Sequence, residues 1–143
     1  AMLRARDLRE FEAALARLQM PMFTVIYADR DGHVLHVFNG AVPKRPRGDV
    51  AYWAGVVRGD SSATLWTDVH AYAELPRALD PASGWLQNAN DPPWSTTLPP
   101  AILPQRYPPY MAPLTPPGAR PQRSLRMLAG DSALTFERVV QLK

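Results

Sequence analysis

The sequence has 143 residues, of which 46% are hydrophobic and 20% charged, as in an ordinary globular domain. No apolar run approaches the roughly 20 residues that a membrane-spanning helix needs, and the absence of cysteine excludes disulfides and thiolate metal sites. The net charge of +3 comes from scattered arginines rather than from a dense basic run, so we expect no nucleic-acid and no membrane partner.

Proline is distributed unevenly along the chain. Of the 16 prolines, 13 lie between Pro76 and Pro121. Proline lacks a backbone donor and interrupts both helices and strand ladders. We therefore expect a single partial domain over 1–143 in three parts: a helix, a hairpin and an asparagine-bearing strand over 3–90, a proline-rich loop over 91–121, and C-terminal helices over 122–143.

The first expected element is an amphipathic helix. Ala1 ahead of Met2 is interpreted as the remnant of a tag, and no signal-peptide pattern follows it. Asp7 and Glu10 make a capping-box-like start, and Pro21 is expected to end the helix. One apolar stripe recurs at helical spacing: Leu8, Phe11, Leu15 and Leu18.

A hairpin is expected next. The segment 22–28 is rich in β-branched and aromatic residues, 29–32 has turn chemistry, and 33–38 alternates polar and apolar side chains. Gly32 can adopt the positive φ of such a turn. Asn39 and Gly40 are expected to break the second strand.

The rest of the chain gives weaker signals. We expect a helical turn over 72–79 and a short strand over 85–90, then the loop, and then helices over 122–128 and 135–142, with Ser132 as a helix cap. Large apolar residues interleave with the prolines of the loop and need a surface to cover. We therefore expect the loop to drape over protein that lies outside this chain.

Two asparagines on the predicted strand are the candidate chemical groups. Side chains alternate along a strand, so Asn88 and Asn90 would share one face, between Trp85 and Trp94. A rigid asparagine amide can donate to an oxyanion, and losing such a donor costs an acyl-transfer enzyme about 10²- to 10³-fold in rate. The alternative is that both asparagines only cap the following proline turn, and the residues alone favour that alternative.

Other candidate sites are weaker. His33 and His36 fall on opposite strand faces, and no third ligand accompanies Asp68 and His70, so we expect no metal and no cofactor. Ser61 and Ser62 lack a nucleophile-elbow context.

Three motifs in order resemble the penicillin acylase family. The segments 23–34 (FTVIYADRDGHV) and 40–45 (GAVPKR) resemble its "N-x-x-Y-A-D-x-x-G-N-I … G-x-x-P-x-R" hairpin, although Thr24 stands where the family has Asn. Segment 84–92 (GWLQNANDP) resembles its "G-[WY]-[LIV]-x-N-x-N-x-x-P" strand. Arg120 and Arg126 resemble two arginines that open a later helix. Within the family, segment 87–90 (QNAN) is more similar to the acyl-homoserine-lactone and aculeacin acylase branch.

The resemblance implies an α+β fold, as part of the αββα sandwich of an N-terminal-nucleophile (Ntn) hydrolase. In these enzymes the large chain begins with a serine that attacks the amide carbonyl and uses its own α-amine as base. By this resemblance Asn90 is the oxyanion donor and Arg120 a supporting residue, whereas Asn88 is structural. Trp85, Asn88 and Trp94 are further candidates for substrate contacts.

The resemblance also bears on substrate and partners. It implies cleavage of an N-acylated small molecule, of the acyl-homoserine-lactone, lipopeptide or β-lactam type, by a periplasmic or secreted enzyme. The nucleophile is not among these residues, so we expect the chain to be inactive alone and to need the small chain and nucleophile segment of the parent acylase. Homodimerisation through exposed strand edges stays open. The alternative from another class is a non-catalytic binding or scaffold module that uses the proline-rich loop.

Overall fold

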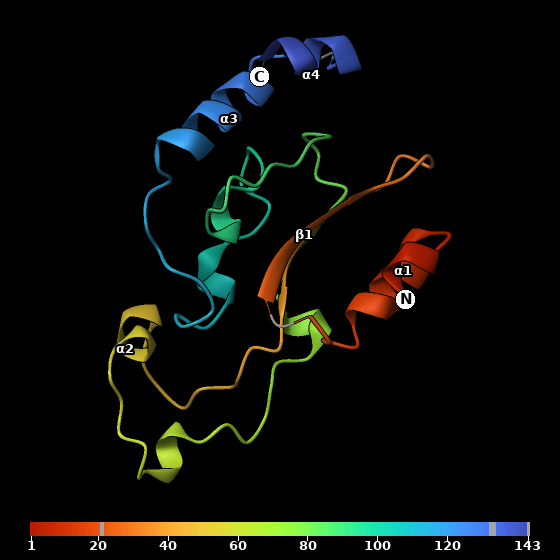
Figure 1. Cartoon of the computed structure of the whole chain (residues 1–143). Helices are drawn as coiled ribbons and strands as arrows, with labels where there is room; N and C mark the ends of the chain where they lie inside the picture. The colour runs from red at the N-terminus through yellow and green to blue at the C-terminus, as the bar shows by residue number, and fades with distance from the viewer. Residues whose placement is uncertain (21, 132–133, 143) are drawn as a thin grey trace.

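A three-stranded antiparallel sheet lies at the centre of the computed structural model, which describes residues 1–20, 22–131 and 134–142. The strands occur in the order β1-β2-β3, and β1 pairs with β2 along its whole length, from Met22 opposite Gly40 to Ala28 opposite Val34. Around the sheet lie helices and irregular segments, so the architecture is mixed α+β, as predicted (Figure 1). The strands are β1 (Met22–Ala28), β2 (Val34–Gly40) and β3 (Arg77–Leu79).

The predicted hairpin is confirmed, and its turn is held by one carboxylate. Asp29 Oδ1 accepts from the backbone N–H groups of Asp31 and His33, each at 3.0 Å. Gly32 has a φ of +92°, a conformation that costs glycine little and other residues more. The predicted break at residues 39–40 is wrong, because β2 runs through Gly40 and both residues pair with β1.

Helix α1 (Leu8–Leu15) covers one face of the sheet. Its start is as predicted, since Asp7 caps it by accepting from Glu10 N at 2.7 Å. The helix ends at Leu15, earlier than predicted, and Leu18 already has a left-handed φ of +50°. Pro21 lies outside the described residues. The core between helix and sheet consists of Leu15, Leu35 and Val37, each almost fully buried. Burial of each side chain contributes about 1.5–3 kcal/mol to the stability of the fold.

The proline-rich segment covers the opposite face of the sheet. In Figure 1, α1 lies on one side of the strands and the segment after Trp85 on the other. Ile102 and Met111 are 2% and 5% exposed, so part of the loop packs within the chain, and the expectation that it covers only absent protein is wrong for these residues. Leu103 and Leu114 remain 40% and 69% exposed.

The stretch from residue 41 to 70 extends away from the sheet as a long arm (Figure 1). It carries α2 (Val50–Ala54) and a 3₁₀ turn, η2 (Ser62–Thr64). The guanidinium of Arg45 lies 3.9 Å from the ring centroid of Trp53, a cation–π contact that helps to order the arm. The arm returns to the body where Pro43 pairs with Val69 in an isolated bridge.

Two predicted elements near the middle of the chain differ from the structure. The helical turn over 72–79 is a 3₁₀ turn, η3 (Tyr72–Glu74), followed by strand β3, because Ala78 pairs with His36 at the edge of the sheet. The strand over 85–90 is wrong: these residues are irregular and make no strand ladder. Asn88 and Asn90 therefore do not share a strand face.

Two helices follow the proline-rich segment. Helix α3 (Ala119–Ala129) begins three residues before the predicted start, because Pro121 fits within a first helical turn, where N–H groups lack partners in any case. It ends, as predicted, at Gly130. Helix α4 (Phe136–Leu142) starts one residue late, with Thr135 Oγ1 accepting from Arg138 N. Ser132, the predicted cap, lies outside the described residues. Among the described helices, none is long and apolar enough to cross a membrane.

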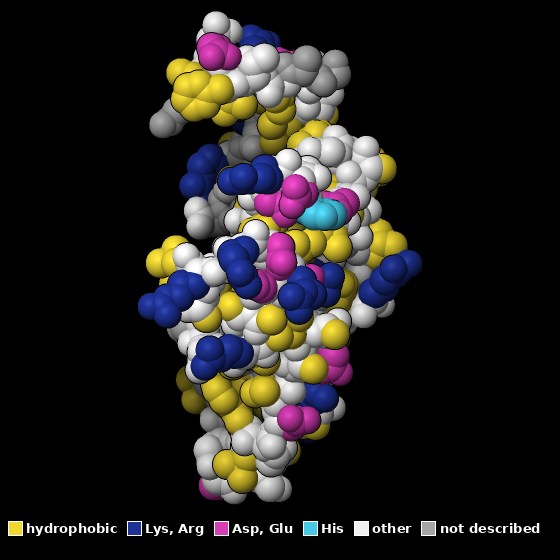
Figure 2. All heavy atoms as spheres, turned by 90° about the vertical axis from the view of Figure 1, so that its right-hand side faces the viewer, with side chains coloured by type: hydrophobic (Ala, Val, Ile, Leu, Met, Phe, Trp, Pro, Cys, Tyr) yellow, Lys and Arg dark blue, Asp and Glu magenta, His cyan; other side chains and the backbone are white. Residues whose placement is uncertain are grey.

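Figure 2 shows the face of the molecule that carries α1. Basic and acidic side chains are interspersed on it, with apolar side chains between them. Two carboxylates of α1 are in ion pairs, Glu10 with Arg6 and Glu12 with Arg77. On this face the positive charge is therefore spread rather than gathered into a basic stripe.

A buried histidine on the sheet gives a testable pH dependence. His36 is fully buried, and neither ring nitrogen hydrogen-bonds to a described residue. Burial lowers its pKa to about 4, whereas an unfolded histidine has a pKa near 6.5. The free energy of unfolding is therefore unaffected by His36 above pH 6.5. As the pH falls from 6.5 towards 4, it decreases, by on the order of 3 kcal/mol in all, because the unfolded state takes up a proton more readily.

We expect His36→Leu to remove that loss, which urea unfolding at pH 7, 5.5 and 4.5 would measure. His33→Leu is the control, because His33 is exposed and paired with Asp80 at 2.8 Å, so the acid loss should persist in it. An unchanged acid loss in His36→Leu would contradict the assignment.

Candidate active-site turn

The candidate site is a closed loop whose two ends are fastened together by reciprocal hydrogen bonds. Gln87 N donates to Thr96 O at 2.8 Å, and Thr96 Oγ1 donates to Gln87 O at 3.1 Å. Both residues are buried, at 5% and 2% exposure. Hydrogen bonds shielded from water are stronger and hold geometry better than exposed ones, so the base of the loop is a fixed platform.

Asn88 forms the first turn of the loop. Its Oδ1 accepts from Asn90 N at 3.1 Å, and its Nδ2 donates to Asp91 O at 3.3 Å. This two-residue spacing is an Asx turn, in which the side chain replaces a backbone acceptor. Both ends of the Asn88 amide are occupied, so its role is to shape the loop, as the alternative reading of the sequence proposed for both asparagines.

Asn90 is held in an unusual backbone conformation. Its φ is +61°, in the left-handed region that non-glycine residues seldom adopt and that asparagine tolerates best. Such conformations cost of order 1–3 kcal/mol and persist only where neighbouring contacts impose them. The hydrogen bond from Asn90 N to Asn88 is one such contact. A second contact comes from Arg120 of helix α3.

Arg120 reaches the turn from the first turn of α3. Its Nη2 donates to Ala89 O at 2.6 Å and to Asn90 Oδ1 at 3.3 Å. A cation near a helix N-terminus opposes the helix dipole, so this position does not serve the helix. A guanidinium can only donate hydrogen bonds, so the Asn90 amide must turn its oxygen to Arg120 and its Nδ2 group away.

The orientation of Asn90 leaves a neutral donor facing solvent. No described residue accepts a hydrogen bond from Asn90 Nδ2, and the residue is exposed. A cavity of about 360 Å³ adjoins it, a size typical of small-molecule sites. The cavity is lined on one side by residues 89–92 and on the other by 115–121.

The other predicted site residues lie elsewhere. Trp94 is half-buried, and its Nε1 donates to Pro113 O at 2.9 Å, which holds the proline-rich segment in place. Trp85 lines a separate cavity that Leu128 and Leu134 also line. Trp85, Asn88 and Trp94 are not among the described residues that line the cavity beside Asn90, so their contact with substrate stays a prediction.

The three histidines lie in different places. His33 binds Asp80 at the hairpin, His36 is buried on strand β2, and His70 Nε2 lies 3.0 Å from the Tyr110 hydroxyl. Over the described ranges, no group of three or more His, Asp or Glu side chains could hold a metal ion.

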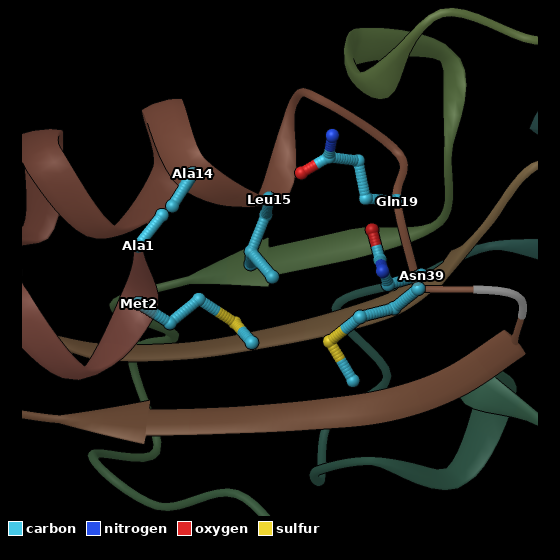
Figure 3. Close-up of a pocket in the computed structure, with 7 residues that line it drawn as sticks. Ala1, Met2, Ala14, Leu15, Gln19 and Asn39 are labelled. Atoms are coloured by element: carbon cyan, nitrogen blue, oxygen red, sulfur yellow. The ribbon is translucent and has the colours of Figure 1, made fainter.

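Another cavity, of about 110 Å³, lies between α1 and the sheet (Figure 3). Gln19 and Asn39 lie at one end of it and Met2 and Leu15 at the other. Asn39 is 2% exposed, and its Oδ1 has no hydrogen-bond partner among the described residues. This cavity is separate from the Asn90 turn and shares no lining residue with it.

A family model described as penicillin amidase matches residues 1–143, the whole chain. The chain belongs to the penicillin amidase family. Membership implies amide hydrolysis as the chemistry of the protein, and the mixed α+β structure is consistent with part of an Ntn-hydrolase fold. The resemblance inferred from the hairpin and the asparagine motif is thereby confirmed at the level of the family.

Sequence reasoning missed several residues that build the turn in this penicillin-amidase chain. Asp91 accepts from three donors around the turn, Ser95 is one of them, and Thr96 closes the base. Asp91 directly before two prolines is a local turn signal that could have indicated a loop rather than a strand. The pairing of Gln87 with Thr96 has no comparable local signal.

The hydroxyl that closes the loop can be tested by a near-isosteric change. Thr96→Val keeps the shape but leaves the buried Gln87 carbonyl without its side-chain donor, which should cost about 1–3 kcal/mol in the free energy of unfolding. Urea denaturation at pH 7 measures this cost. Thr24→Val is the matched control, since Thr24 makes no side-chain hydrogen bond to a described residue and should change stability by less than about 0.5 kcal/mol. Equal stabilities for the two variants would contradict the role of Thr96.

Proposed function

We propose that this chain is the part of an Ntn amidohydrolase that supplies an oxyanion-hole donor, Asn90, with Arg120 as its support. The observation that carries the proposal is the fixed Asn90 amide, which turns its oxygen to Arg120 and leaves its Nδ2 group, beside a cavity, without a partner among the described residues. Asn88, which shapes the turn, differs in that both ends of its amide are occupied.

The chemistry follows from where charge develops during amide hydrolysis. Attack on the carbonyl converts its oxygen into an oxyanion, and a donor fixed in advance stabilises that charge without reorganising. An asparagine amide is neutral and does not titrate, so it is ready at any pH at which the nucleophile works. The attacking group is the N-terminal serine of the large chain, activated by its own α-amine, on a segment other than this one.

The substrate class is an N-acylated small molecule, and we favour the branch that acts on acyl-homoserine lactones and aculeacin-like lipopeptides over β-lactams. Support comes from the sequence of the turn at residues 87–90 and from the cavity, which is walled by Pro92, Pro116 and Pro117 and open to solvent. Polar residues, among them Asp91, Thr115 and Arg120, also line the cavity, so the prolines offer an acyl chain apolar contact on part of the wall, beside the Asn90 donor. A periplasmic or secreted location accompanies this proposal.

The partner is the rest of the acylase. Strand β1 pairs only with β2 within the described sheet, and an unpaired edge of seven residues invites another strand. Along it Met22, Phe23 and Ile26 are 67%, 56% and 48% exposed. Pairing of β1 with strands that carry the nucleophile would cover these side chains and extend the sheet.

The central test is Asn90→Ala in the complete acylase that contains this chain. We expect kcat to fall about 10²- to 10³-fold because one oxyanion donor is lost, while the precursor still processes itself into two chains. Hydrolysis of decanoyl-p-nitroanilide measures kcat, and a denaturing gel measures processing.

Gln105→Ala provides the matched control. Gln105 is an exposed carboxamide in the same proline-rich segment and makes no side-chain hydrogen bond to a described residue, so its loss should leave kcat unchanged. Wild-type kcat in processed Asn90→Ala enzyme would remove Asn90 from the mechanism and with it the proposed function of this chain.

Arg120 is tested by changing the shape of its donor group. Arg120→Lys keeps a positive charge but removes the planar guanidinium, whose Nη2 group donates to both Ala89 O and Asn90 Oδ1. The shorter lysine side chain does not bring its ammonium group to the same point. Loss of one hydrogen bond to a charged group corresponds to a fall in kcat of about tenfold or more. Arg126→Lys, further along the exposed side of α3, is the control and should retain kcat. Equal kcat values in both variants would show that Arg120 does not support Asn90.

A further inference from the structure

The residue after the proposed oxyanion donor has an arrangement of contacts that the motif does not account for. The family pattern quoted above leaves the position of Asp91 open. In the structure its Oδ1 accepts from Ala89 N at 2.8 Å, and its Oδ2 accepts from Gln87 Nε2 at 3.2 Å and from the Ser95 hydroxyl. Both carboxylate oxygens are therefore occupied by donors from within the loop.

The backbone on both sides of Ala89, directly before Asn90, is fixed by hydrogen bonds. The N–H of Ala89 is held by Asp91 and its C=O by Arg120. The N–H of Asn90 is held by Asn88. With its backbone fastened at these points, Asn90 stays in its left-handed conformation, and its side chain leaves the loop in one direction.

A carboxylate suits this position better than an amide would. Each oxygen of Asp91 faces at least one donor, and hydrogen bonds to an ionised acceptor are about twice as strong as neutral ones. An asparagine here would direct an N–H group towards either Ala89 N or Gln87 Nε2, and two donors facing each other repel. The loop would then relax into other turn geometries.

The base of the loop around Asp91 is held by a buried side chain. Gln87 Nε2 donates to Ser95 O at 2.6 Å as well as to Asp91, and Gln87 is 5% exposed. Gln87 therefore holds Asp91 and Ser95 together at the base of the loop that carries Asn90.

We propose that Asp91 is a positioning residue, whose ionised carboxylate collects the Ala89, Gln87 and Ser95 donors and so holds the Asn90 amide where the oxyanion forms. The inference rests on the proposed function, because it gives Asp91 an effect on the reaction only through Asn90. Asp91 itself does not touch the reacting atoms.

The experiment is a double-mutant cycle in the complete acylase. Asp91→Asn should lower kcat about tenfold with KM changed by less than about twofold, since the chemical step and not substrate binding depends on the donor. In the Asn90→Ala background the same substitution should change kcat by less than about twofold, because residues that act as a unit are not additive. Decanoyl-p-nitroanilide is the substrate, and titration with phenylmethylsulfonyl fluoride counts the active serines.

Asp31→Asn is the control variant. Asp31 is an exposed carboxylate at the hairpin turn, its side chain binds no described residue, and its loss should leave kcat and KM unchanged. If Asp91→Asn does not mature, Ser95→Ala decides in its place, because it removes one donor from the same carboxylate and should lower kcat about threefold or more.

The outcomes separate the two ideas. If Asn90→Ala is inactive while matured Asp91→Asn or Ser95→Ala keeps wild-type kcat, the positioning role is wrong and the proposed function stands. If Asp91→Asn lowers kcat by the same factor with and without Asn90, the carboxylate acts on general stability and the inference is overturned. If Asn90→Ala is fully active, the proposed function fails and the role of Asp91 fails with it.

Discussion

The contact between Arg120 and the turn at Ala89 and Asn90 is the constraint on which the site depends. It joins two segments 30 residues apart in sequence, the start of α3 and the loop at residues 87–96. Because a guanidinium offers only donors, the contact determines which end of the Asn90 amide faces the protein and which faces the cavity. Without it, the amide could rotate, and neither end would be distinguished.

Buried polar residues give this contact a fixed base. Gln87, Thr96 and Thr97 are almost fully buried, and the first two bind each other. The surrounding prolines add to the rigidity, since proline reduces the conformational freedom that folding must remove. Trp94, bound to Pro113, fastens the far side of the loop. The proline-rich segment therefore holds the turn in place. The same segment packs over the sheet and supports Asn90.

Local signals in the sequence predicted the parts of the fold that local interactions determine. The cap at Asp7 and the turn at residues 29–32 each lie within a few residues of their partners, and the start of helix α1 and the turn of the hairpin were predicted correctly. The end of α1 was wrong because Leu18 continues the apolar spacing while its backbone has left the helix. Spacing reports which face is apolar and not where the backbone changes direction.

The asparagine-bearing segment was predicted as a strand of only six residues, and so short a segment gives a weak signal. Asp91 overrides it by drawing Ala89 N and the Gln87 side chain onto one carboxylate. The support from Arg120 was predicted through the family resemblance and not from the residues, since nothing local relates positions 90 and 120. The pairing of Thr96 with Gln87 was missed for the same reason.

The distribution of charge around the turn distinguishes it from a simple cation site. A guanidinium in direct contact with an oxyanion would also attract other anions, including a product carboxylate. Here the cation lies behind a neutral amide, on its oxygen side, and polarises it, so that the N–H on the other side becomes a stronger donor. The negatively charged carboxylate of Asp91 accepts its hydrogen bonds from donors within the loop. In the proposed reaction such a donor would favour the oxyanion, whose charge is concentrated on one atom, without strongly retaining the carboxylate that is released.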